Sequence, residues 1–158
     1  MTNEEEKLKR FLKEHGIKAE HLRFGETLHT VQDTLRVAGA ELKHVTKTMI
    51  FKGPDGKTVA AMVPAEFRVS VSCLSKATGL EKLELANADE AYGMTGYPVG
   101  GMPFFGYEAV LVIDPKVFEQ DHIYTGGGST FSLTRISTQE LKRVANPIVR
   151  RIRGHKSN

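Results

Sequence analysis

The stretch HVTKTMIF, residues 44–51, has the composition of a buried β-strand, and neighbouring elements are expected to pack around it. Most of its residues are β-branched or apolar. Because side chains on a strand alternate between faces, Lys47 shares one face with the apolar residues at positions 45, 49 and 51. A lysine on such a face either extends to water or faces a cavity, a partner or an anion. The strand alone favours extension to water.

The segments on either side of this strand predict a mixed α+β fold. The turn GPDG at residues 53–56 leads to a second apolar strand at 57–64, and the two are expected to form a hairpin in the middle of a sheet. Further strands are expected over residues 21–24, 83–86, 109–113 and 131–136. Helical spacing of apolar residues predicts helices over residues 4–15 and 31–38. A short helix is expected over residues 71–77, ended by Gly79, and the capping box STQE at 137–140 predicts a helix that runs to about residue 145. Asn3 is the expected cap of the first helix and Thr30 that of the second.

The length and composition suit one domain over residues 1–158 with its own hydrophobic core. Cys73 is the single cysteine, so no internal disulfide is expected, which fits a reducing compartment. The N-terminus is acidic and polar, unlike a signal peptide, and no apolar run reaches membrane-spanning length. We therefore expect a cytoplasmic protein that does not enter a membrane.

Positive charge is concentrated near the C-terminus. The formal net charge is +3 and the sequence pI is about 9.0, which is compatible with a polyanionic partner. Six Lys or Arg residues and no acid lie between residue 142 and the C-terminus. Residues 147–158 are expected to form a basic tail, which is either a solvated terminal segment or a source of phosphate contacts.

Two glycine-rich segments are candidates for a binding site. The sequence GYPVGGMPFFG at residues 96–106 combines glycine, proline and aromatic residues, which suits a loop that presents backbone groups to a small ligand. The sequence TGGGS at residues 125–129 lacks the lysine and spacing of a phosphate-binding P-loop. The six histidines show no metal-ligand spacing, so we predict no metal and no cofactor.

Together, the motifs resemble the YbaK/ProX family, which is related to the editing insertion of bacterial prolyl-tRNA synthetases. The matching pieces follow the family's order over roughly residues 20–145: HTV at 29–31, VTKTMIF at 45–51, AMVP at 61–64, TGYPVGG at 95–101, VID at 112–114, YTGGG at 124–128 and STQEL at 137–141. The resemblance implies one mixed α/β domain with a curved central sheet flanked by helices. It also implies hydrolysis of mischarged aminoacyl-tRNA in trans.

The resemblance further implies a set of site residues. Lys47 matches the lysine most needed for activity, and the implied substrate-binding residues are Thr30, Thr48, Gly100, Gly101, Met102, Pro103, Gly127 and Gly128. No metal belongs to this set. The Lys47-Thr48 pair favours the cysteine-removing or a broader archaeal-type branch. Many family members have a proline where Phe104 stands, whereas here the proline is one residue earlier, at Pro103. Some bacterial members have an acid shortly after the Gly-Gly run, where this chain has the sequence STFSL at residues 129–133. The amino-acid pocket is therefore expected to differ.

The expected activity is deacylation of Cys-tRNA(Pro), or of tRNA(Pro) carrying another small amino acid. The expected partners are the acceptor end of tRNA and prolyl-tRNA synthetase. Met49, Met102 and Phe104 are candidate walls of a small pocket that selects by size, with plain core packing as the alternative. A non-catalytic tRNA- or synthetase-binding module and an amino-acid sensor of the same fold are the alternative functions.

Overall fold

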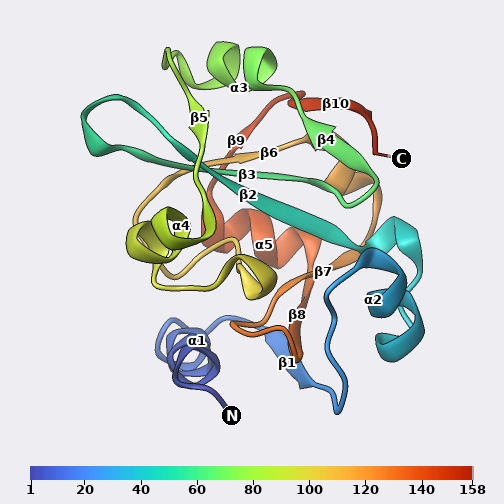
Figure 1. The fold of residues 1–158 in the computed structure, drawn as a ribbon. Coiled ribbons are helices and arrows are strands. Elements are labelled where there is room, and N and C mark those ends of the chain that lie inside the picture. Colours follow the sequence, from blue (N-terminus) through green and yellow to red (C-terminus); the bar gives the residue numbers. More distant parts are fainter. Residues whose placement is uncertain (158) are drawn as a thin grey trace.

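The hairpin of β2 and β3 forms the middle of a five-stranded sheet in the computed structural model, which describes residues 1–157 (Figure 1). The strand order is β5-β2-β3-β6-β9. β2 and β3 are antiparallel with Lys47 opposite Val63, whereas β3, β6 and β9 run parallel. The strands of this sheet are β2 (Thr46–Lys52), β3 (Thr58–Pro64), β5 (Glu84–Leu85), β6 (Val110–Ile113) and β9 (Ile148–Val149).

Two smaller antiparallel sheets complete the β-structure. One has the order β1-β8-β7, and the other pairs β10 with β4. Their strands are β1 (Ala19–Arg23), β7 (His122–Gly126), β8 (Ser132–Ser137), β4 (Phe67–Val69) and β10 (Arg153–Lys156). An isolated parallel bridge between Val45 and Tyr124 joins the start of β2 to β7.

Five α-helices flank these sheets, within the described residues. They are α1 (Asn3–Glu14), α2 (Val31–Ala38), α3 (Val71–Thr78), α4 (Ala88–Thr95) and α5 (Thr138–Ala145). Thr30 caps α2 as predicted, accepting a hydrogen bond from the Asp33 N–H at 3.0 Å. The predicted cap of α1 was wrong by one residue. Thr2 is the cap, because it forms a reciprocal capping box with Glu5.

The two faces of the five-stranded sheet bury separate cores. Leu12 of α1, Ala91 of α4 and Leu141 of α5 belong to the core on the face of Ile50. On the opposite face, Leu74 of α3 packs in the core that contains Phe51, Val63 and Ile152. The mixed α+β fold expected from the sequence is confirmed. No helix within residues 1–157 is long and apolar enough to cross a bilayer.

The basic C-terminal segment is integrated into this fold up to residue 157. Ile152 is fully buried, and its N–H donates a 2.9 Å hydrogen bond to the buried carboxylate of Asp114. The Arg153 guanidinium donates to the other oxygen of Asp114 at 2.8 Å. Burial would raise the pKa of Asp114, but the hydrogen bonds from Lys116, Ile152 and Arg153 outweigh it and hold the pKa below its usual value. Asp114 therefore anchors residues 148–156 to the end of β6.

Candidate active site

A cavity of about 270 Å³ lies where β2 meets β7. Its walls come from four parts of the chain: the segment that leads into α2, the first half of β2, the 3₁₀ helix η3 (Val99–Gly101) with Met102, and the end of β7. Leu133 of β8 and Ala65 after β3 complete the lining. About half of the lining side chains are apolar, and the others, which include five threonines and Lys47, offer polar groups that could orient a small ligand.

The cavity follows a free edge of β2. β2 pairs with β3 along its whole length, but it pairs with β5 only at Phe51 and Lys52. The Ile50 carbonyl accepts from the Ala86 N–H on the side away from β3. Because backbone groups alternate along a strand, the N–H and C=O of Thr48 point to that same side, beyond the reach of β5. The prediction that this strand avoids the sheet edge therefore holds only for its second half.

Lys47 borders this cavity as a half-buried cation. Burial lowers the pKa of its ammonium group, and the positive charge of Arg68 lowers it further. Within residues 1–157, no carboxylate forms an ion pair with either Lys47 or Arg68. Two neighbouring cations without a carboxylate are suited to holding an anion, since an anionic group relieves both their repulsion and the desolvation of Lys47.

The structure brings together five of the nine residues expected at the site. Thr30, Lys47, Thr48, Gly100 and Met102 line the cavity. Met49 also lines it, whereas Phe104 is fully buried in the core. The remaining four predicted residues lie outside the cavity lining: Gly101, Pro103, Gly127 and Gly128.

Close backbone packing explains Gly101 and the glycines after Thr125. The Gly128 N–H donates a 2.8 Å hydrogen bond to the Gly101 carbonyl, so η3 and the segment after β7 touch directly. A Cβ atom at Gly101 would lie 2.3 Å from the Ser129 nitrogen, and one at Gly126 would lie 2.3 Å from the Met102 carbonyl oxygen. These glycines therefore hold two loops together, and in doing so they position Gly100 and Met102 at the cavity.

Two buried hydroxyl groups lie at the cavity wall, and the sequence predicted only one of them, that of Thr48, as part of the site. Thr48 Oγ1 and Thr125 Oγ1 are buried and have no hydrogen-bond partner among the described residues. An unpartnered buried hydroxyl is unfavourable by about 1–3 kcal/mol until another group satisfies it. Thr125 and its neighbour Tyr124 were missed as lining residues. The sequence offered only their position before the glycine run, which does not reveal which elements β7 adjoins.

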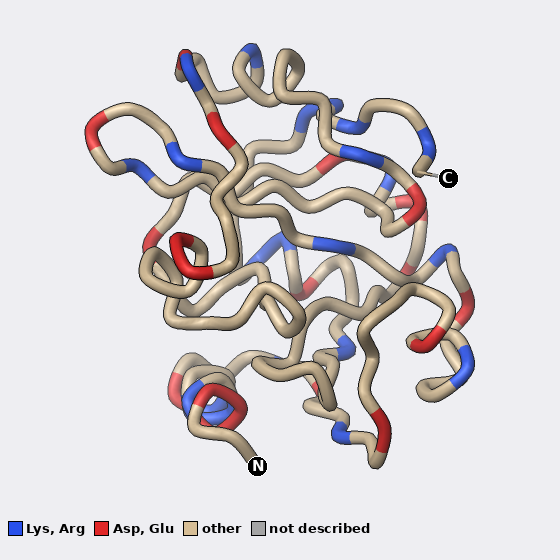
Figure 2. Tube along the Cα trace, viewed as in Figure 1, with Lys and Arg blue, Asp and Glu red and all other residues tan. Residues whose placement is uncertain are grey.

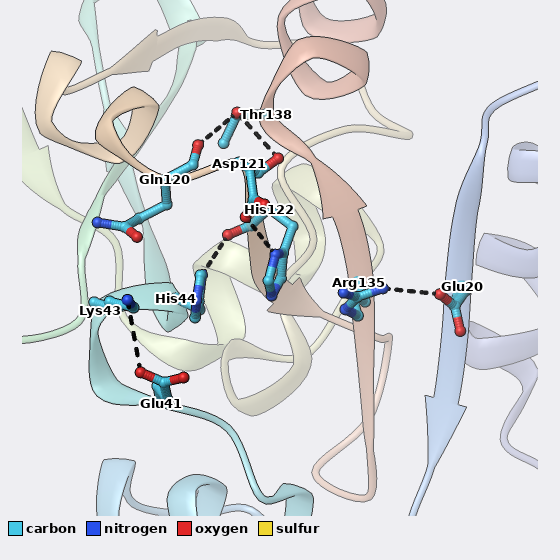
Figure 3. A network of polar contacts seen from close by, with 9 residues as sticks. All are labelled: Glu20, Glu41, Lys43, His44, Gln120, Asp121, His122, Arg135 and Thr138. Atoms are coloured by element: carbon cyan, nitrogen blue, oxygen red, sulfur yellow. Dashed lines mark hydrogen bonds and ion pairs between the residues drawn. The ribbon is translucent and has the colours of Figure 1, made fainter.

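A stacked histidine pair holds the entrance of β2 against β7 (Figure 3). The rings of His44 and His122 have centroids 3.9 Å apart and planes 13° apart. His44 Nδ1 donates to the His122 carbonyl at 2.8 Å, and His122 Nδ1 donates to Asp121 Oδ1 at 2.6 Å. Potential metal-ligand atoms of these three residues lie within 4.8 Å of one another, a grouping that sequence spacing did not predict. The ring stacking and the two hydrogen bonds join the start of β2 to β7, which is consistent with a structural clamp.

The chain belongs to a known family of domains. Residues 25–144 match the family described as the aminoacyl-tRNA editing domain, and the chain belongs to that family. This confirms the family that the sequence motifs indicated.

Its relatives include proline–tRNA ligases. The ligase of Thermosipho melanesiensis is 27% identical over 101 residues, which is 64% of this chain and 18% of the ligase. That of Desulfovibrio desulfuricans is 35% identical over 72 residues, or 46% of this chain and 12% of the ligase. The chain thus spans less than a fifth of the length of either ligase.

Solved structures share the fold over nearly the whole chain. The hypothetical protein APE2540 has a TM-score of 0.85 and 27% identity, and the match covers 94% of this chain and 99% of that protein. A candidate trans-editing enzyme for prolyl tRNA synthetase has a TM-score of 0.88 and 20% identity, with 98% and 99% covered. At this identity the second likeness shows the fold alone.

Proposed function

We propose that this domain is a deacylase that acts in trans and hydrolyses the ester of tRNA mischarged with a small amino acid. Cys-tRNA(Pro) is the first substrate to test, because the Lys47-Thr48 pair resembles the cysteine-removing branch of the family. The observation that carries the proposal is the position of Lys47, which borders a small cavity beside Arg68 and lacks a carboxylate partner among residues 1–157. Membership in the editing-domain family supports the same reaction class.

The proposed mechanism depends on positioning. An aminoacyl ester is already activated, so its hydrolysis requires a well-placed nucleophile more than strong acid–base chemistry. In this mechanism Lys47 neutralises the phosphate of the terminal adenosine or the developing oxyanion. The backbone of Gly100 and Met102 and the outward-facing groups of Thr48 bind the ester carbonyl and the substrate ammonium. The nucleophile is water, which releases the free amino acid, or the substrate's own thiol when the amino acid is cysteine, which forms a cyclic thioester. In both cases the bond between the acyl carbon and the ribose oxygen breaks, and the ribose hydroxyl of the tRNA is the leaving group.

Selection in this proposal depends on the small volume of the site. Met49 and Met102 reach the cavity, and the whole space is about 270 Å³. A missing methylene in an apolar pocket changes binding by only about 1–3 kcal/mol, so such a pocket excludes large amino acids better than it ranks small ones. We therefore expect more than one small amino acid to be removed at measurable rates, with proline-charged tRNA hydrolysed slowly.

The decisive experiment is deacylation of tRNA(Pro) charged separately with Cys, Ala, Ser and Pro. We expect Lys47→Ala to lower hydrolysis by at least about 100-fold, the usual effect of removing one group that stabilises transition-state charge. Lys52→Ala is the matched control, because Lys52 lies at the far end of the same strand and pairs with Glu90 at 2.6 Å. It should leave the rate nearly unchanged.

The outcomes separate the proposed function from its alternatives. Wild-type turnover in the Lys47→Ala protein contradicts the role given to Lys47. Failure of the wild type to hydrolyse any of the four substrates, together with tight tRNA binding, favours a non-catalytic binding module. Tight binding of a free amino acid without turnover favours a sensor.

A further inference from the structure

The C-terminal strand extends the surface that begins at Lys47. β10 pairs with β4, which carries Arg68, and Lys156 lies opposite Phe67. The Ser70 N–H donates a 2.7 Å hydrogen bond to the Ile152 carbonyl, so the residues just before β10 follow on from the end of β4. Figure 2 shows Lys and Arg positions gathered along β4 and the C-terminal segment at one corner of the domain. This corner adjoins the mouth of the cavity, because Ala65 lines the cavity and donates its N–H to the Val45 carbonyl, only two residues before β4 begins at Phe67.

The cations of this corner fall into two groups. Arg153 and Lys156 have acidic partners: Arg153 Nη1 is 2.8 Å from Asp114, and Lys156 Nζ is 3.8 Å from Glu66. The other group is exposed and forms no ion pair within the part of the chain that the structure describes; it consists of Arg68, Arg150 and Arg151. Arg153 anchors the C-terminal segment, and the charge of Lys156 is partly offset by Glu66. The second group leaves positive charge without a local counter-charge.

We propose that Arg68, Arg150 and Arg151 form a phosphate-binding ridge along which the acceptor arm of a tRNA lies while its aminoacyl end enters the cavity beside Lys47. The proposal rests on the proposed function, which supplies the RNA. Exposed arginines without carboxylate partners bind phosphates independently of base sequence, and they therefore position a substrate without selecting its nucleotides. In this arrangement the ridge supplies affinity for the RNA, and the cavity supplies recognition of the amino acid.

Binding measurements on the full chain test the ridge. We would measure the affinity of unacylated tRNA(Pro) over a series of salt concentrations for the wild type and the double variant Arg150→Ala/Arg151→Ala. Each phosphate contact steepens the slope of log affinity against log salt concentration by about 0.9. One such contact therefore increases affinity about 8-fold when salt is lowered from 1 M to 0.1 M. The double variant should therefore bind roughly 10- to 60-fold more weakly near 0.1 M salt, with a slope shallower by up to about 2.

The matched control removes the same charge elsewhere. Lys9→Ala/Lys13→Ala takes two exposed cations from α1, which lies on the other side of the domain from β10 (Figure 1). We expect near wild-type affinity and slope from this protein. An equal loss in both double variants overturns the ridge, since net charge alone then explains binding. Wild-type affinity in the Arg150→Ala/Arg151→Ala protein overturns it as well.

A kinetic comparison distinguishes failure of the ridge from failure of the deacylase. The ridge variant should lose kcat/KM on full-length aminoacyl-tRNA and keep the wild-type rate on a short aminoacylated oligonucleotide ending in CCA, which does not reach the ridge. If the wild type hydrolyses neither substrate, the proposed function fails. The tRNA affinities of the wild type and the two double variants then test the ridge by themselves. Binding of the wild type to phosphatidylserine vesicles with none to tRNA overturns the ridge as an RNA surface.

Discussion

Replacing Gly101 with alanine tests whether direct backbone contact holds the two glycine-rich loops together. The added Cβ atom would lie 2.3 Å from the Ser129 nitrogen and 2.7 Å from the Gly128 carbonyl carbon, whereas ordinary contacts begin at 3.4 Å. The difference between 3.4 Å and 2.3 Å requires one loop to move by about 1.1 Å. Both neighbours are backbone, so no flexible side chain can yield in their place.

The expected loss of stability combines two effects. Overpacking of a well-packed interior is unfavourable by about 1–3 kcal/mol. The 2.8 Å hydrogen bond from the Gly128 N–H to the Gly101 carbonyl is stretched by the same movement, which removes about 1 kcal/mol. We therefore expect the free energy of unfolding of Gly101→Ala to fall by about 2–4 kcal/mol. Deacylation should also fall, because Gly100 and Met102 line the cavity on either side of this residue.

Urea unfolding followed by circular dichroism measures this change. Gly93→Ala provides the matched control, since a Cβ there meets nothing within 4 Å and the residue lies inside α4. That protein should be more stable than the wild type by about 0.5–1 kcal/mol, because alanine is the better helix former. A Gly101→Ala protein that unfolds at the wild-type urea concentration would refute the close-contact explanation.

Two further predictions concern buried carboxylates. Asp114→Ala should lower the free energy of unfolding by about 3 kcal/mol, because it leaves the Arg153 guanidinium and three backbone N–H groups without their acceptor. Urea unfolding checks this against the exposed control Glu119→Ala, and equal stability of the two variants contradicts it. The hydrogen bonds from Arg143 lower the pKa of Glu140 to about 2. A lowered folded-state pKa stabilises the fold above the unfolded value of about 4.3, and this contribution is lost as the pH falls towards 2. The wild type should therefore lose more stability than Glu140→Gln between about pH 4.5 and 2.5, and parallel curves in acid unfolding would exclude the effect.

The elements that sequence predicted well are those fixed by local patterns. The hairpin after the GPDG turn and the Thr30 cap depend on residues that lie next to one another, so periodicity and capping rules suffice. Lys47, Thr30 and Gly100 were assigned to one site through family motifs, and the structure places all three at the same cavity.

The features that the sequence did not predict depend on which distant segments of the chain pack against a residue. A glycine run shows that something approaches closely, but it does not show whether a ligand or another loop does so; at Gly127 and Gly128 the close neighbours belong to the protein itself. The free edge of β2 results from the shortness of β5, which pairs with only two of its residues. The C-terminal basic residues look like a tail in sequence because the acid that anchors them, Asp114, lies almost forty positions earlier.

The anchoring of residues 148–156 also has a consequence for synthesis of the protein. β9 borders β6, and Ile152 fills part of the core on the Phe51 face beside Leu74 of α3, so the cover of this face stays incomplete until residues 148–156 have been synthesised. Because contacts between segments distant in sequence form late, a nascent chain should pass through a stage in which its first hundred or so residues are collapsed but still recognisable by chaperones. Pairing of β10 with β4 then completes the cover of the Phe51 face.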